Sequence, residues 1–192
     1  MNFIYFLNEA GKTTVQPKTK DELKEIIEDT IEEQGFNCDL NFIDTSKITD
    51  MEGLFLRSEF NGDISKWDVS NVKDMEGMFL KSEFNGDISK WNVSKVKNMK
   101  LMFCRSNFNG DISKWNVSNV KDMSCMFENS SFNGDISKWD VSSVENMSWM
   151  FCESKFNGDI SKWDVSHVRK IDSMFKYSSL EGNEPAWYKE RN

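Results

Sequence analysis

The amino-acid sequence predicts an α/β solenoid in which six 24-residue coils stack behind an N-terminal cap of short strands and a helix. Three observations predict this class. The segment Phe-Asn-Gly-Asp-Ile-Ser-Lys-Trp recurs every 24 residues, apolar residues occupy the same phases in each copy, and the copies at both ends are degenerate. Degenerate ends are expected of a stack, because a terminal coil has a neighbour on one side only. The five clear copies begin at Phe60, Phe84, Phe108, Phe132 and Phe156.

The first element is a cap over residues 1–35. Alternating apolar residues at 3–7 predict a strand, and a turn leads to a second strand at 13–16. Thr19 and Glu22 match a capping box, and the apolar stripe that follows predicts a helix over 20–34 with one buried face. We expect these elements to cover the first coil, since an open solenoid end would invite edge pairing.

Residues 36–179 are expected to form the six coils, and residues 180–192 a degenerate C-terminal cap that keeps only Trp187 in phase. Each coil carries Val-x-x-Met-x-x-Met-Phe, whose spacing of three predicts a helical or 3₁₀-like turn running into a short strand. Ten of the eleven methionines occupy two phases of this motif. Leu and Ile replace Met at those phases, which favours core positions over a soft binding surface or a metal-binding row.

Composition excludes several functional classes. The 192 residues are 38% hydrophobic, but no apolar run is long enough to span a membrane and the first residues lack a signal-peptide pattern. A net charge of −8 disfavours direct nucleic-acid binding, which depends on Lys and Arg. One histidine and four irregularly spaced cysteines provide no nucleophile–base pair and no zinc pattern. We therefore expect a cytoplasmic protein with reduced thiols, no enzymatic activity and no cofactor.

Aspartate and asparagine each recur once per coil. A row of calcium sites is one interpretation of the aspartates, because hard cations bind carboxylate oxygens. The simpler interpretation, which we favour, is that each aspartate accepts backbone N–H groups within its own turn and that the asparagines form a hydrogen-bonded ladder. The aspartates are Asp39, Asp63, Asp87, Asp111, Asp135 and Asp159, and the asparagines are Asn61, Asn85, Asn109, Asn133 and Asn157.

The repeat resembles known repeat families. The pattern Val72-x-x-Met75-x-x-Met78-x-Leu80-x-x-x-x-Phe84-x-Gly86-x-Ile88-x-x-Trp91 resembles a leucine-rich repeat with Met and Phe in several Leu positions. More closely, Asp68-Val69-Ser70-Asn71-Val72-Lys73-Asp74-Met75 with Met78-Phe79 resembles the BspA-like bacterial surface protein repeat, found in mycoplasma lipoproteins of unknown function. The resemblance implies an open, right-handed, leucine-rich-repeat-like solenoid with a binding role and no established activity.

Positions that vary between copies are the best candidates for a binding surface, because stacking constrains only the constant ones. The variable positions flank the Met-Phe segment, and we expect them to share one face with a constant serine row. Trp149 stands out because other copies carry Gly, Leu or Cys at its phase, although packing over Cys125 is an alternative. The predicted partner-binding residues are Arg57, Lys81, Lys100, Arg105, Trp149, Glu153 and Tyr177.

The charge distribution leaves two functional hypotheses. The first is a monomeric, non-enzymatic module that binds a protein partner through the variable face. Residues 1–59 hold 13 acidic and 6 basic residues, whereas residues 60–179 are balanced. The second hypothesis is therefore an intracellular inhibitor, such as a phage anti-defence or toxin-immunity protein, whose acidic cap blocks a basic nucleic-acid-binding site. Its predicted acidic face is Glu25, Glu28, Asp29, Glu32 and Glu33.

Overall fold

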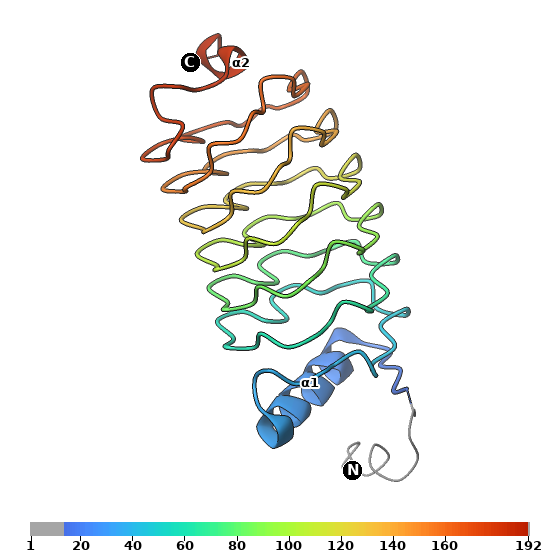
Figure 1. Ribbon diagram of the computed structural model, residues 1–192. Coiled ribbons are helices and arrows are strands. Elements are labelled where there is room, and N and C mark those ends of the chain that lie inside the picture. The colour runs from blue at the N-terminus through green and yellow to red at the C-terminus, as the bar shows by residue number, and fades with distance from the viewer. Residues whose placement is uncertain (1–13, 192) are drawn as a thin grey trace.

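The chain winds into a stack of coils with a helix across its N-terminal end (Figure 1). The computed structural model describes residues 14–191. Helix α1 spans Lys20–Gln34 and the short helix α2 spans Ala186–Lys189. Between the two helices, the coils repeat every 24 residues and make the molecule elongated (Figure 1). The strand expected at 3–7 lies outside the described residues.

The expected α/β class is wrong, because the coils are not built from strands. Over residues 14–191, strand-type pairing is limited to isolated parallel bridges. Of the strand expected at 13–16, the described residues 14–16 form one bridge, between Val15 and Ile43. The coils therefore stack in parallel and in register without the strand ladders of a leucine-rich-repeat-like solenoid. One row of bridges links neighbouring coils through Asp50, Asp74, Asn98, Asp122, Asn146 and Lys170.

Turns replace strands in the Met-Phe segment because of the direction of its hydrogen bonds. In a β-strand, successive N–H groups point to opposite sides. On one side the segment follows this pattern, since the alternate N–H groups of Met75, Gly77, Phe79 and Lys81 donate to carbonyls of the next coil at 2.8–3.0 Å. The N–H groups between them do not bond to the preceding coil, as those of a strand would, but close turns within their own coil, as Leu80 N–H does to the carbonyl of Gly77 at 3.0 Å. This pattern joins the coils firmly, although no residue run is extended enough to be a strand.

Helix α1 covers the N-terminal end of the stack. Thr19 caps the helix, since its hydroxyl oxygen accepts the N–H of Glu22 at 3.1 Å, and the Glu22 carboxylate accepts the N–H of Lys18 at 2.7 Å. Gly35 ends the helix with φ +84°, a conformation that favours glycine. The buried side of the helix joins the core that runs through the coils and consists of Leu23, Ile26, Ile27 and Thr30.

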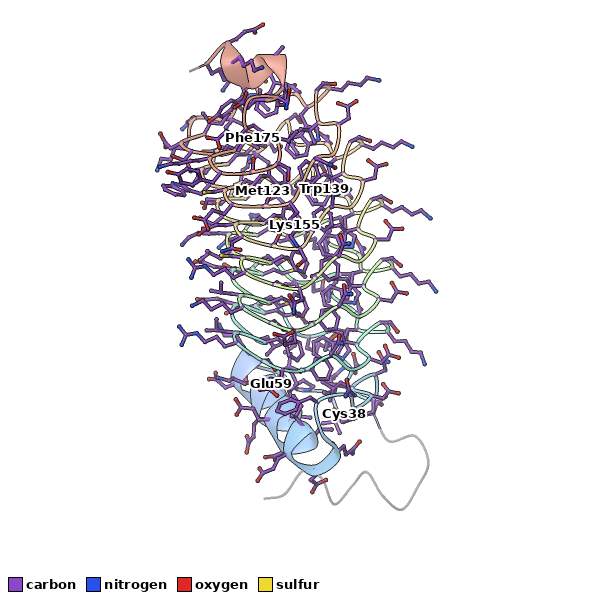
Figure 2. All side chains as sticks on the ribbon, turned by 60° about the vertical axis from the view of Figure 1, so that its left-hand side comes forward. Cys38, Glu59, Met123, Trp139, Lys155 and Phe175 are labelled. Carbon is purple, nitrogen blue, oxygen red and sulfur yellow. The ribbon has the colours of Figure 1, made fainter. Side chains whose placement is uncertain are left out.

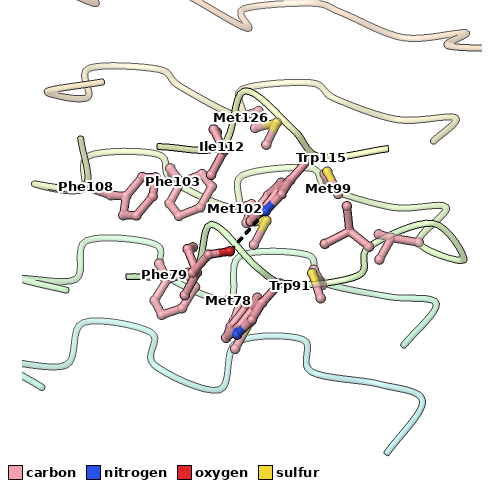
Figure 3. Close-up of a cluster of buried hydrophobic side chains, with 14 of the residues drawn as sticks. Met78, Phe79, Trp91, Met99, Met102, Phe103, Phe108, Ile112, Trp115 and Met126 are labelled. Atoms are coloured by element: carbon pink, nitrogen blue, oxygen red, sulfur yellow. Dashed lines mark hydrogen bonds between the residues drawn. The ribbon is translucent and has the colours of Figure 1, made fainter. Parts of the chain in front are cut away.

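The core is a continuous column of aromatic and methionine side chains. Each inward phenylalanine stacks on its copy in the next coil, as Phe79 does on Phe103 with ring centroids 5.5 Å apart (Figure 3). Each coil tryptophan is buried and donates its indole N–H to the preceding coil, as Trp115 does to the carbonyl of Ile88 at 3.1 Å (Figure 3). All ten repeat methionines are fully buried, which confirms that they are core residues.

Two polar rows organise the outer turns. Asp111 accepts the N–H of Ser113 at 2.9 Å, and the same bond recurs in the other coils. Asn85 accepts the N–H of Asn109 at 2.8 Å, and this bond also repeats along the stack. These contacts confirm that the aspartates cap turns and that the asparagines form a ladder. Glycine is required at Gly86, beside these turns, because a Cβ there would lie 2.8 Å from the Phe84 ring.

The C-terminal residues extend the stack beyond the last coil. Trp187 keeps the phase of the tryptophan row and donates its indole N–H to the carbonyl of Ile160 at 3.0 Å. Arg191 donates to the carbonyls of Val165 and Val168 at 2.7 and 2.8 Å. These bonds hold α2 and the following residues against the last coil.

Candidate functional site

Two rows of left-handed residues run along the stack. In each row φ lies between 48° and 63°. Residues other than glycine rarely adopt this backbone conformation, because their Cβ then approaches a carbonyl oxygen. We call these positions the left-handed rows. The first consists of Gly53, Gly77, Leu101, Cys125, Trp149 and Ser173, and the second, four residues later, of Arg57, Lys81, Arg105, Asn129, Glu153 and Tyr177.

Six of the seven predicted partner-binding residues lie in these rows and are exposed. Trp149 belongs to the first row, and Arg57, Lys81, Arg105, Glu153 and Tyr177 belong to the second. The seventh, Lys100, is half-buried beside the first row. The structure therefore brings the predicted residues onto one turn segment of each coil, in register from coil to coil. Figure 2 shows how side chains project in rows along the stack, while the labelled Met123 and Trp139 lie inside it.

Ion pairs between coils occupy some of these side chains. The Lys100 Nζ lies 2.7 Å from the Glu76 carboxylate, which raises the pKa of Lys100 above its ordinary value. Arg105 lies 3.9 Å from Glu128 at the edge of the second row. Because exposed pairs of this kind are weak, Arg105 remains able to contact a partner, whereas Lys100 mainly links two coils.

The C-terminal half of the rows carries both of their aromatic side chains. The Trp149 side chain is 41% exposed, so packing over Cys125 does not bury it. Tyr177 is 66% exposed, and the Lys176 ammonium lies 4.9 Å from its ring centroid. The N-terminal half carries the exposed cations Arg57 and Lys81 instead. The rows thus present a basic end and an aromatic end.

The constant serine row does not share this face, contrary to expectation. Ser82, Ser106, Ser130 and Ser154 are buried. Their hydroxyl oxygens accept the N–H of the phenylalanine two residues later, as Ser106 does from Phe108 at 3.1 Å. The serines are constant because they close a turn in every coil.

The predicted acidic face lies on the outer side of α1. Glu25, Glu28, Glu32 and Glu33 are exposed, and Asp29 is half-buried. One pair forms within the helix, between Lys24 and Glu28 at 3.7 Å. The sequence prediction of a contiguous acidic surface at this end agrees with these exposures, but its role in binding stays a prediction.

The cysteines and the histidine offer little chemistry. Burial raises the pKa of the Cys104 and Cys125 thiols to about 12, so both stay protonated and weakly nucleophilic at neutral pH. His167 is exposed, with Nδ1 3.3 Å from the Ser166 hydroxyl. Within residues 14–191, no group of three or more His, Cys, Asp or Glu side chains could hold a metal ion.

Sequence reasoning missed a row of positively charged residues, which we call the lysine ladder. It consists of Lys73, Lys97 and Lys121. Backbone bonds of 2.8 Å from Lys97 N–H to the Lys73 carbonyl, and from Lys121 N–H to the Lys97 carbonyl, place these residues directly above one another. All three side chains are exposed. Glu145 and Arg169 continue the row and line a shallow hollow beside Lys121. The signal was in the sequence, because Lys recurs at this phase in three consecutive copies.

Comparisons with known proteins identify a family and nothing finer. Residues 22–130 and 83–187 match the family described as "Mycoplasma protein of unknown function, DUF285". Searches of curated proteins and of solved structures found no match. Neither helix in the described range is long and apolar enough to cross a membrane.

Proposed function

Since the chain belongs to the DUF285 family of Mycoplasma proteins of unknown function, we propose its role from its own surface: a non-enzymatic module that binds a protein partner through the left-handed rows. The buried aromatic and methionine side chains recur almost unchanged from coil to coil and account for the stacking of the coils. The left-handed rows vary from coil to coil, as expected of positions that determine which partner is bound.

The observation that carries this proposal is the presence of side chains where glycine fits best. Gly53 and Gly77 adopt the left-handed conformation without steric cost. Leu101 and Trp149 adopt it at the same phase, which costs about 1–2 kcal/mol per residue. A conformational cost that stability does not require is typical of functional surfaces. We infer that these side chains are retained for what they contact outside the chain.

The composition of the rows indicates the chemistry of the partner. Trp149 and Tyr177 provide rigid, exposed aromatic anchors, the residue type that dominates binding energy at protein interfaces. Arg57 and Lys81 lie at the other end. A protein surface with an apolar pocket beside acidic groups would complement this arrangement.

The finer family relationship and the location are also proposals. The Asp-Val-Ser-Asn-Val-x-x-Met pattern supports a relation to BspA-like repeats, which implies a binding role. Four free cysteines suit a reducing compartment, so we propose that the protein acts in the cytoplasm.

Replacement of the aromatic anchors tests the proposed function. We expect Trp149→Ala combined with Tyr177→Ala to weaken partner binding by about 2 kcal/mol or more, roughly 30-fold, without loss of fold. Partners captured by the wild-type protein from a lysate of its native host would be purified and titrated by calorimetry. Phe36→Ala is the matched control, because Phe36 is 45% exposed but lies outside the rows. Equal binding by the double variant and the control would contradict the proposal.

A second function, inhibition of a basic target by α1, is favoured by the exposed acidic side of that helix. Charge reversal at Glu25, Glu28, Asp29, Glu32 and Glu33 would then abolish binding, and added salt would weaken binding steeply. The aromatic variant would bind normally. A single titration series with both variants separates the two functions, since they change different parts of the molecule.

A further inference from the structure

The lysine ladder carries positive charge that the chain does not neutralise. Within residues 14–191, Lys73 and Lys97 form no ion pair, and Lys121 pairs only loosely with Glu145, at 4.0 Å, while its ammonium donates to the Ser143 carbonyl at 3.1 Å. Coils stack about 4.8 Å apart, so like charges repeat within a Debye length of about 10 Å. Such repulsion lowers stability, and an external anion would relieve it. The ladder thus presents three stacked positive charges that could pair with an external row of anions.

Helix α1 has the opposite imbalance. The like-charged pairs Glu25–Asp29 and Glu28–Glu32 are spaced i,i+4, which destabilises an isolated helix. The last turn carries Glu32 and Glu33 but no basic residue, and the negative end of the helix dipole disfavours acids there. An external row of cations would relieve both effects.

We propose that the lysine ladder of one molecule binds the acidic side of α1 from a second copy. Glu25, Glu28 and Glu32 are separated by about 4.5 and 6 Å along the helix axis, at a rise of about 1.5 Å per residue. This spacing matches the coil spacing of about 4.8 Å over three rungs. A helix laid along the stack therefore faces one carboxylate to each lysine.

The contact joins two different surfaces, so it is heterologous. It closes into a small ring or continues from molecule to molecule, depending on the rotation between copies. It leaves the left-handed rows free, because those rows belong to another segment of each coil. The monomer expected from the sequence is then the form at high salt and low concentration, since exposed ion pairs are individually weak and screened.

Sedimentation velocity with charge-swapped variants tests the proposal. The wild-type protein should associate with rising concentration at about 50 mM salt, and the association constant should fall at least about tenfold at about 500 mM salt. The ladder variant Lys73→Glu/Lys97→Glu/Lys121→Glu and the helix variant Glu25→Lys/Glu28→Lys/Glu32→Lys should each be monomeric alone. A mixture of the two should associate again, because the reversed charges complement each other.

A matched control reverses three lysines in the same coils on another row, with Lys66→Glu/Lys90→Glu/Lys114→Glu. This control should associate as the wild type does. The proposal is overturned if the wild type stays monomeric at low salt, if the mixture stays dissociated, or if the control loses association as fully as the ladder variant. Binding of inorganic polyphosphate to the ladder without any self-association would likewise overturn it in favour of a polyanion site. Thermal melts of every variant verify that the swapped charges leave the coils folded.

Discussion

At the scale of single residues, each coil tryptophan links neighbouring coils both by packing and by a hydrogen bond. Trp115 is 4% exposed and donates to the carbonyl of Ile88. We expect Trp115→Ala to lower the free energy of unfolding by about 3–5 kcal/mol, because it removes a large buried ring and one of the two hydrogen bonds that the Ile88 carbonyl accepts, the other coming from the N–H of Trp91. Chemical denaturation measures the change. His167→Ala should be nearly neutral, and a loss below about 1 kcal/mol for Trp115→Ala would contradict its assignment to the core.

The left-handed rows give a second prediction for single residues. Gly77 has φ +58°, and an added Cβ would meet only Leu80 at an ordinary 3.7 Å. Gly77→Ala should therefore destabilise the fold by about 1 kcal/mol through backbone strain alone. Gly77→Asn should cost less, because asparagine tolerates this conformation better. Equal thermal shifts for the two substitutions would show that contacts, not φ, decide the residue here.

The core residues were predictable from the repeat, but the backbone conformation of the variable residues was not. An apolar side chain that recurs at one phase, such as methionine, must meet its own copy in the next coil, so the periodicity of apolar residues identifies the core. Gly53 and Gly77 are compatible with a left-handed backbone at this position of the repeat. Leu101 and Trp149 at the same position are residue types that disfavour it, so the sequence did not predict it. Propensity cannot predict a conformation that stacking imposes against local preference.

At the scale of elements, the aspartate turns predict how stability depends on pH. Hydrogen bonds from the backbone N–H and hydroxyl of the serine two residues later lower the pKa of Asp87, Asp111 and Asp135 below the ordinary value of 3.8. The folded state therefore holds the carboxylate more strongly than the unfolded state does. The stability gained is complete above about pH 5 and is lost as pH falls through these lowered pKa values.

Substitution by asparagine should flatten this acid limb. Asn116 already accepts the N–H of Ser118 at 3.1 Å in a turn where Asp140 does the same for Ser142 at 3.1 Å, so the amide preserves the bond. The variant Asp87→Asn/Asp111→Asn/Asp135→Asn should lose less melting temperature between about pH 7 and pH 3 than the wild type. Glu25→Gln/Glu28→Gln/Glu32→Gln removes the same number of acids elsewhere and should keep the steeper limb. Parallel acid limbs in the wild type and the aspartate variant would contradict this explanation.

The strands were predicted wrongly because extended strands and successive tight turns can both stack in parallel and in register. A recurring Val-x-x-Met-x-x-Met-Phe segment with apolar residues on one side fits a short strand. In the structure, the N–H of Met78 instead closes a turn to Met75 at 3.2 Å, and the N–H of Phe79 reaches the next coil at 3.0 Å. The apolar pattern identifies which side chains face the core. The direction of each N–H depends instead on φ at the two left-handed residues of each coil.

At the scale of the whole molecule, the three proposed binding surfaces lie at different places along the stack. The acidic side of α1 lies at the N-terminal end, the lysine ladder runs through three coils, and the aromatic anchors lie towards the C-terminal end. The lysine ladder and the left-handed rows depend on register, because each consists of one side chain per coil. The sequence predicted the acidic and aromatic surfaces from composition and variation. It also holds the signal for the ladder, Lys at one phase in three copies, but the backbone bonds between coils show that these residues are stacked.

This dependence on register gives the last prediction. Removal of residues 108–131 joins Asn107 to Phe132, so every row keeps its phase and coil-to-coil bonds such as Asn107 N–H to the Ser82 carbonyl can form as before. We expect this variant to fold cooperatively with a lower melting temperature and a maximum dimension about 5 Å shorter in small-angle scattering. Removal of residues 108–119 shifts all later rows by half a period, places polar side chains over the aromatic column and should prevent folding. If both deletions melted alike, stacking by identical phase would not be what holds the molecule together.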